Sequence, residues 1–94
     1  IAEQCPTFFG GDPDMFAAHL AYEHRSIGTE LSLLTAVRQQ VAAILRELKA
    51  ADFQRVGNHS EAGRMTLEDL LRNIGNHVLH HIQFIEEKRK SLGI

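Results

Sequence analysis

Apolar residues recur at spacings of three and four along two long stretches of the chain. This spacing places them on one side of an α-helix, because 3.6 residues complete a turn. In the first stretch, from Glu30 to about Lys49, the apolar positions are Leu31, Leu34, Val37, Val41, Ile44, Leu45 and Leu48. In the second stretch, from Thr66 to Gly93, they are Leu67, Leu70, Leu71, Ile74, Val78, Ile82 and Ile85. The pattern therefore predicts two long amphipathic helices.

The second stretch also carries signals for where its helix begins and ends. Thr66 stands three residues before Asp69, which resembles a capping box with Asp in place of the usual Glu. Lysine and arginine fill the last turn, where they complement the helix dipole, and Gly93 follows as a natural stop. We therefore expect one uninterrupted helix between these two ends.

A further helix is predicted to start at Asp12-Pro13, where an N-cap residue precedes proline at the first helical position. It would run to about Arg25, with only a weak apolar stripe. The lead-in 1–11 is expected to be irregular, and 50–65 is expected to be a loop with one short helical turn, because both contain Gly with Pro, Asn or Ser. These elements predict an all-α fold, a helical bundle of about three helices in a single domain covering residues 1–94.

Composition and charge exclude several classes of protein. The formal charge of −2 argues against a nucleic-acid surface, which is normally strongly basic. The chain has neither an apolar run long enough for a transmembrane helix nor a signal-peptide pattern. The single Cys5 cannot form an internal disulfide, which fits a reducing, cytoplasmic setting.

Three of the six histidines lie in the last predicted helix. His77 and His81 are four residues apart, so their imidazoles share one side of the helix, at the spacing at which two rings can bind one metal ion. Both fall on the apolar stripe, whereas His80 groups with polar residues. A buried imidazole needs a polar partner, and that partner is either a metal ion or a set of waters, carbonyls or carboxylates. The residues alone leave both interpretations open.

The segment from Arg55 to Ile85 resembles the DinB-like (DinB/YfiT-like) superfamily of small metal-binding four-helix bundles. The match to its R-x-G-x-H and G-x-x-T-L-x-x-L-L patterns rests on Arg55, Gly57, His59, Gly63, Thr66, Leu67, Leu70 and Leu71. His77 and His81 match its H-x-x-x-H pair. One departure is Phe84, where the family often has glutamine.

The resemblance implies a divalent metal ion, most often nickel or zinc, held by three histidines. His77 and His81 would be two of these metal ligands, and His59 is a candidate group beside the metal or the substrate. The third ligand of the family lies on an earlier helix, ahead of the segment with which this chain begins, and His19 is only the nearest residue of the right type. The chain starts at Ile1 rather than at methionine, so we expect a processed protein or a piece of a longer one.

A partial bundle would leave an apolar face uncovered, so we expect a dimer, or an N-terminal segment, to complete it. The resemblance implies a metal-dependent transferase that uses a low-molecular-weight thiol, such as bacillithiol, mycothiol or glutathione, on a small-molecule substrate. The alternative is a non-catalytic module for dimerisation or regulation that has lost the full metal site. No residue in the sequence is assigned a catalytic role, and neither nucleic acid nor a membrane is an expected partner.

Overall fold

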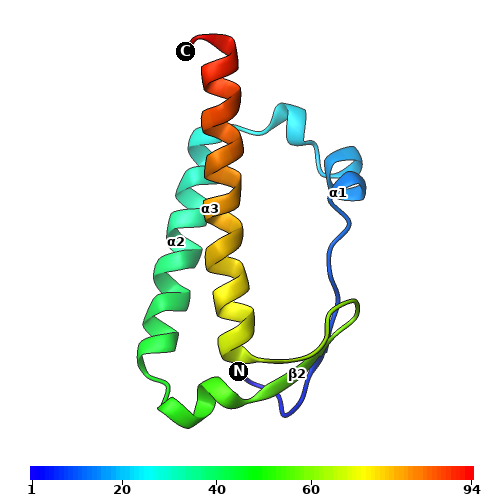
Figure 1. Ribbon diagram of the computed structural model, residues 1–94, viewed down its shortest axis with the longest axis vertical. Helices are drawn as coiled ribbons and strands as arrows, with labels where there is room; N and C mark the ends of the chain where they lie inside the picture. The colour runs from blue at the N-terminus through cyan, green and yellow to red at the C-terminus, as the bar shows by residue number, and fades with distance from the viewer.

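Two long helices dominate the structure, a computed structural model that describes residues 1–94. Helices α2 (Ile27–Arg46) and α3 (Leu67–Leu92) run in opposite directions, and short elements join them at one end (Figure 1). The other elements, in chain order, are β1 (Thr7–Phe8), α1 (Pro13–His19), the 3₁₀ turn η1 (Tyr22–His24), the 3₁₀ turn η2 (Ala50–Gln54), β2 (Val56–His59) and β3 (Gly63–Thr66). The two long helices predicted from the apolar pattern are confirmed, with α2 shifted by three residues toward the N-terminus. Neither is long and apolar enough to cross a membrane.

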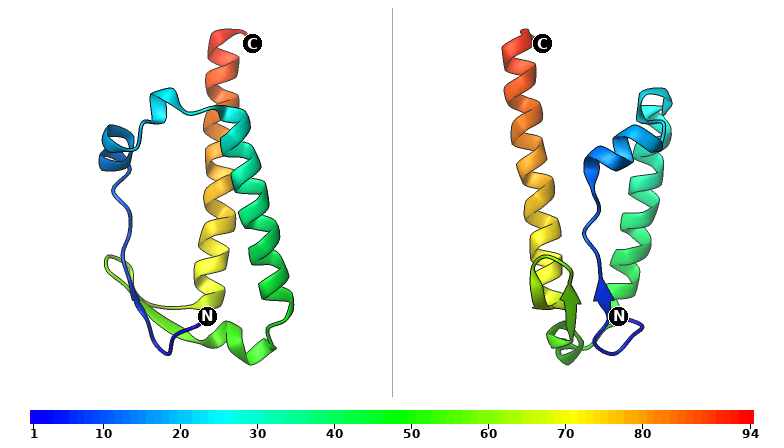
Figure 2. Two further views of the ribbon diagram at one scale, coloured as in Figure 1. Left: turned by 180° about the vertical axis from the view of Figure 1, so that it is seen from behind. Right: turned by 90° about the vertical axis from the view of Figure 1, so that its right-hand side faces the viewer.

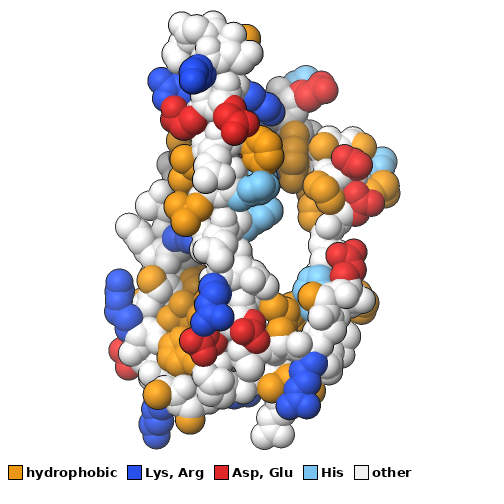
Figure 3. Space-filling view, viewed as in Figure 1, with side chains coloured by type: hydrophobic (Ala, Val, Ile, Leu, Met, Phe, Trp, Pro, Cys, Tyr) orange, Lys and Arg blue, Asp and Glu red, His pale blue; other side chains and the backbone are white.

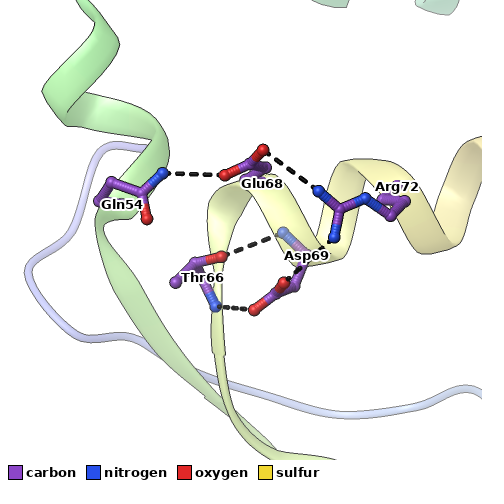
Figure 4. Close-up of polar contacts among 5 residues, drawn as sticks. All are labelled: Gln54, Thr66, Glu68, Asp69 and Arg72. Atoms are coloured by element: carbon purple, nitrogen blue, oxygen red, sulfur yellow. Dashed lines mark hydrogen bonds and ion pairs between the residues drawn. The ribbon is translucent and has the colours of Figure 1, made fainter.

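Helix α3 begins with the reciprocal cap that its sequence predicts. The Asp69 N–H donates to the Thr66 hydroxyl at 3.0 Å, and the Thr66 N–H donates to the Asp69 carboxylate at 3.1 Å (Figure 4). These bonds satisfy backbone donors that have no partner within the first turn of the helix. The Gln54 side chain donates to Glu68 at 2.9 Å, so the same turn is also tied to η2.

Helix α1 is shorter than the sequence predicts. It ends at His19 instead of reaching about Arg25, because Ala21 has a left-handed backbone (φ 56°) and the chain continues as a 3₁₀ turn. The Arg25 guanidinium donates to the Leu20 carbonyl at 2.9 Å and lies 4.9 Å from the centre of the Tyr22 ring. No residue of α1 is buried, so no packing opposes this break.

The prediction of an all-α fold is wrong, because three short strands form a small mixed sheet in the order β1-β2-β3. Strand β1 lies in the lead-in that was expected to be irregular, and it pairs in parallel with β2, with Thr7 opposite Asn58. Strands β2 and β3 form an antiparallel hairpin within the predicted loop, with His59 opposite Gly63. Gly63 ends the hairpin loop in a left-handed conformation (φ 76°), so the glycine that signals a loop also permits this hairpin.

The lead-in is held against the hairpin at Arg55 and Gly57. The two Nη atoms of Arg55 donate to the carbonyls of Ile1 and Glu3, at 2.6 and 2.7 Å. Gly57 is the one buried residue, and a Cβ there would lie 2.9 Å from the Phe8 ring and 3.2 Å from the Pro6 carbonyl. Glycine is therefore needed at position 57, where the lead-in runs close beside β2.

The chain alone has no buried apolar core. No hydrophobic side chain is buried, and 21 large ones are exposed. The accessible surface is 8080 Å², whereas a folded chain of 10.5 kDa normally exposes about 5,400 Å². The radius of gyration is 16.3 Å, against about 12 Å for a compact domain of this length. A side view shows α2 and α3 diverging away from the joined end (Figure 2).

Candidate metal centre

His77 and His81 form a close pair near the middle of α3. Their Nε2 atoms are 2.8 Å apart, and the two rings stand edge to face, with an interplanar angle of 86° and centroids 4.3 Å apart. The pair arises because residues four apart on a helix stack one turn above the other. In a hydrogen bond at this distance, one Nε2 donates and the other accepts.

The distance between the two Nε2 atoms suits a shared metal ion. Bonds of about 2.0–2.1 Å to a tetrahedral ion place two ligand nitrogens about 3.3 Å apart, and an angle of 90° places them about 2.9 Å apart. The observed 2.8 Å would therefore have to widen by at most about half an ångström, which small side-chain rotations supply. This distance is compatible with two neighbouring ligands of one divalent ion.

The pair stands without a third ligand from the same chain. No group of three or more His, Cys, Asp or Glu side chains is placed to hold a metal ion. Both histidines are exposed, so the burial that their place on the apolar stripe predicts is not found in the single chain. In the space-filling view, histidine side chains lie on the flank of α3 that borders the opening toward the N-terminal segment (Figure 3).

His80 lies beside the pair without joining it. Its ring centroid is 6.4 Å from that of His81, and it packs edge to face on Phe84, with centroids 4.7 Å apart. His80 thus packs on an aromatic side chain, although its helical spacing groups it with polar residues. Phe84 stands where the DinB-like pattern often has glutamine, so an aromatic ring rather than a side-chain amide contacts His80.

His59 is engaged in the hairpin rather than near the pair. Its Nδ1 accepts hydrogen bonds from the backbone N–H groups of Glu61 and Ala62, at 3.0 and 3.1 Å, and so shapes the loop. Its ring packs edge to face on Phe8, with centroids 5.2 Å apart. Only Nε2 is free of these contacts, so the role of His59 beside a metal or a substrate stays a prediction.

The structure gives the R-x-G-x-H pattern a shared role that its spacing does not reveal. Arg55 binds backbone carbonyls of the lead-in, Gly57 admits β1, and His59 orders the hairpin loop and contacts Phe8. All three hold the lead-in and the hairpin together. A sequence shows only that these residue types recur at fixed spacing, because their partners lie about fifty residues away along the chain.

A cavity of about 240 Å³ lies where the lead-in, the hairpin and the start of α3 meet. Its apolar lining includes Phe8, Leu48, Met65 and Leu70. Leu48 and Leu70 belong to the two predicted apolar stripes, so these stripes turn toward the same space at the joined end of the helices. Sequence reasoning missed the cavity, because it is formed by segments that are far apart in the chain.

The family comparison covers most of these features. The model of the DinB superfamily matches residues 5–85, which include the lead-in strand, α2, the hairpin and the part of α3 that carries the His77–His81 pair. No curated protein and no solved structure gives a significant match to the chain.

Proposed function

This chain belongs to the DinB superfamily, and we propose that it binds a divalent metal ion, zinc or nickel, through the Nε2 atoms of His77 and His81. The observation that supports the proposal is the 2.8 Å separation of these two atoms on one side of α3.

The activity that fits such a centre is transfer chemistry with a low-molecular-weight thiol. A bound divalent ion lowers the pKa of a coordinated thiol or water and so produces a nucleophile at neutral pH. The chain contributes two imidazoles on an exposed surface, which leaves room for a thiol and a small substrate from solution. No side chain is assigned a catalytic role, and the cytoplasmic location expected from Cys5 stays a prediction.

A second candidate function is that of a non-catalytic module for dimerisation or regulation. It is favoured by the exposure of the apolar side chains along α2 and α3, since monomeric proteins rarely leave large apolar patches uncovered. In this case a metal ion at the His77–His81 pair would strengthen the assembly instead of activating a thiol.

Metal content tests the proposal directly. We expect the chain, loaded with zinc and dialysed without chelators, to retain metal, and His77→Ala or His81→Ala to weaken zinc binding at least about tenfold, because each removes one of two ligands. His80→Ala is the matched control, since it removes a histidine from the same helix but not from the pair. Binding would be measured by calorimetry and by elemental analysis. Equal loss in all three variants, or a wild-type chain free of metal, contradicts the proposal.

A further inference from the structure

Two arginines line a polar cleft where the lead-in meets the hairpin. The cleft has a volume of about 360 Å³, and it is lined by Gln4, Cys5, Arg55, Val56, Asn58 and Arg64. Asn58 on β2 is the cross-strand partner of Arg64 on β3, so these two side chains lie on the same face of the sheet. No acidic residue belongs to the lining. The cleft therefore combines positive charge with side-chain amides and contains no carboxylate.

Neither of these guanidinium groups is neutralised by a carboxylate of residues 1–94. The ion pairs of the structure are made by other arginines, at positions 25, 72 and 89. Arg55 donates instead to the backbone carbonyls of Ile1 and Glu3, which carry no net charge. Two uncompensated positive charges in one cleft repel each other, and an anion between them would convert this repulsion into attraction.

The cleft still has N–H groups to offer to such an anion. A guanidinium carries five N–H donors, and Arg55 uses two of its nitrogens to bind the lead-in. The Asn58 amide gives one hydrogen to the Cys5 sulfur, at 3.5 Å, and keeps a second. Arg64 is exposed on β3. Planar guanidinium groups bind the paired oxygens of a carboxylate or a phosphate in a bidentate manner.

We propose that this cleft binds the carboxylate or phosphate group of a small molecule, with Arg64 and Arg55 as charged partners and Asn58 as a neutral donor. Its volume supports a small molecule as the ligand, because pockets for such ligands start at about 300 Å³. The two hydrogen bonds of Arg55 to the lead-in support a preformed site, since they restrict the guanidinium before any ligand binds.

The anion site is separate from the proposed metal centre. The cleft lies at the joined end of the helices, whereas His77 and His81 lie near the middle of α3. The sequence has a formal charge of −2, so the chain as a whole does not attract anions. Binding of an anion would therefore report the local arrangement of the two arginines.

Titration with inorganic phosphate and, separately, with acetate tests the cleft, with sodium chloride at matched ionic strength as the reference. We expect the backbone amide NMR signals of Cys5, Asn58 and Arg64 to shift. Shifts with phosphate alone assign a phosphate group, shifts with acetate alone assign a carboxylate, and shifts with both assign a site for either group. Each of these results supports the proposal.

Variants of Arg64 locate the anion. Arg64→Gln should weaken its binding at least about tenfold, because it removes a bidentate charged partner, and Arg64→Lys should weaken it less, because it keeps the charge but loses the planar fork. Arg38→Gln is the matched control, since it removes the same charge from an exposed position on α2. Circular dichroism checks that all three variants keep their helices. Arg55 is left unchanged because it also holds the lead-in.

Three results would overturn the anion site. The first is the absence of shifts at about 10 mM of both anions, ten times a dissociation constant of about 1 mM. The second is unchanged binding in Arg64→Gln, which places the anion elsewhere. The third is an equal loss in Arg38→Gln, which shows that binding follows net charge and not the cleft.

Discussion

Single residues in the lead-in and the hairpin control how the ends of this chain are joined. Gly57 is buried where β1 pairs with β2. The backbone N–H groups of Asn58 and Ser60 donate hydrogen bonds to the lead-in, to the Pro6 carbonyl at 2.8 Å and to the Phe8 carbonyl at 2.9 Å. The two strands can lie this close because glycine has no Cβ. Arg55, Gly57 and His59 thus stabilise the joined end of the helices, about 15 Å along α3 from His77.

Gly57→Ala should weaken the packing of β1 against β2, because the alanine Cβ would lie 2.9 Å from the Phe8 ring. We expect a loss of about 1–3 kcal/mol of stability, as for other overpacked sites. Hydrogen exchange should show the Asn58 and Ser60 amides losing protection while α3 keeps its own.

Gly75→Ala is the matched control, since no atom lies within 4 Å of a Cβ there and alanine favours the helix by about 0.5–1 kcal/mol. Equal stability changes in the two variants, or unchanged amide protection in Gly57→Ala, would contradict close packing of β1 against β2 at Gly57.

Among the elements, α3 is the one whose sequence specifies it most completely. Its N-terminal cap, its ion pairs from Arg72 to Glu68 (3.2 Å) and to Asp69 (3.8 Å), and its end at Gly93 are all local. The hydrogen bond from the Thr66 backbone N–H lowers the pKa of the Asp69 carboxyl, and the Thr66 hydroxyl and the Arg72 charge lower it further. The start of this helix is therefore sensitive to acid.

The pH dependence of α3 follows from the sign of this shift. Because the folded pKa of Asp69 lies below its ordinary value of 3.8, its contribution to stability is present above that pH and is lost as the pH falls through the folded pKa. Asp69→Asn should lack this part of the acid destabilisation. Melting curves followed by circular dichroism between about pH 6 and pH 2 would measure it.

Asp14→Asn in α1 serves as the control for this experiment, because it also removes an exposed carboxylate from the first turn of a helix but makes no reciprocal cap. If both variants follow the wild-type acid transition, the Thr66–Asp69 cap does not contribute to it.

At the scale of the whole molecule, residues 1–94 have little internal packing. An accessible surface of 8080 Å² without a buried hydrophobic side chain leaves little of the apolar burial that normally offsets chain entropy. The long helices are joined at one end by η2 and the small sheet, and a cavity lies beside this junction. The stability of the fold therefore depends strongly on what packs against the exposed apolar side chains of α2 and α3.

If a second copy of the chain packs against these side chains, as the sequence leads us to expect, the stability of the fold depends on protein concentration. Dilution favours the unfolded or dissociated chain by mass action, so each tenfold dilution should lower the melting temperature by a few degrees. Differential scanning calorimetry over a hundredfold range of concentration would show the trend. A melting temperature of the wild type that does not change with concentration contradicts this expectation.

The sequence by itself determined the two long helices, the ends of α3, the spacing that pairs His77 with His81, and the family. These follow from local signals, namely apolar periodicity, caps, and residue types at fixed intervals, which do not depend on distant contacts. The early end of α1 did not follow, because a weak apolar stripe cannot hold Tyr22 to Arg25 in the helix.

Only the tertiary structure decided that the lead-in and the predicted loop form a sheet, and that Arg55, Gly57 and His59 join them. The pairing of β1 with β2 and the contacts of Arg55 and Gly57 with the lead-in need partners about fifty residues away. Such pairing leaves no periodic signal in segments of two to four residues. The structure also decided that the stripe carrying His77 and His81 is exposed in the single chain. Periodicity marks which side of a helix is apolar, but the elements around it decide whether that side is covered.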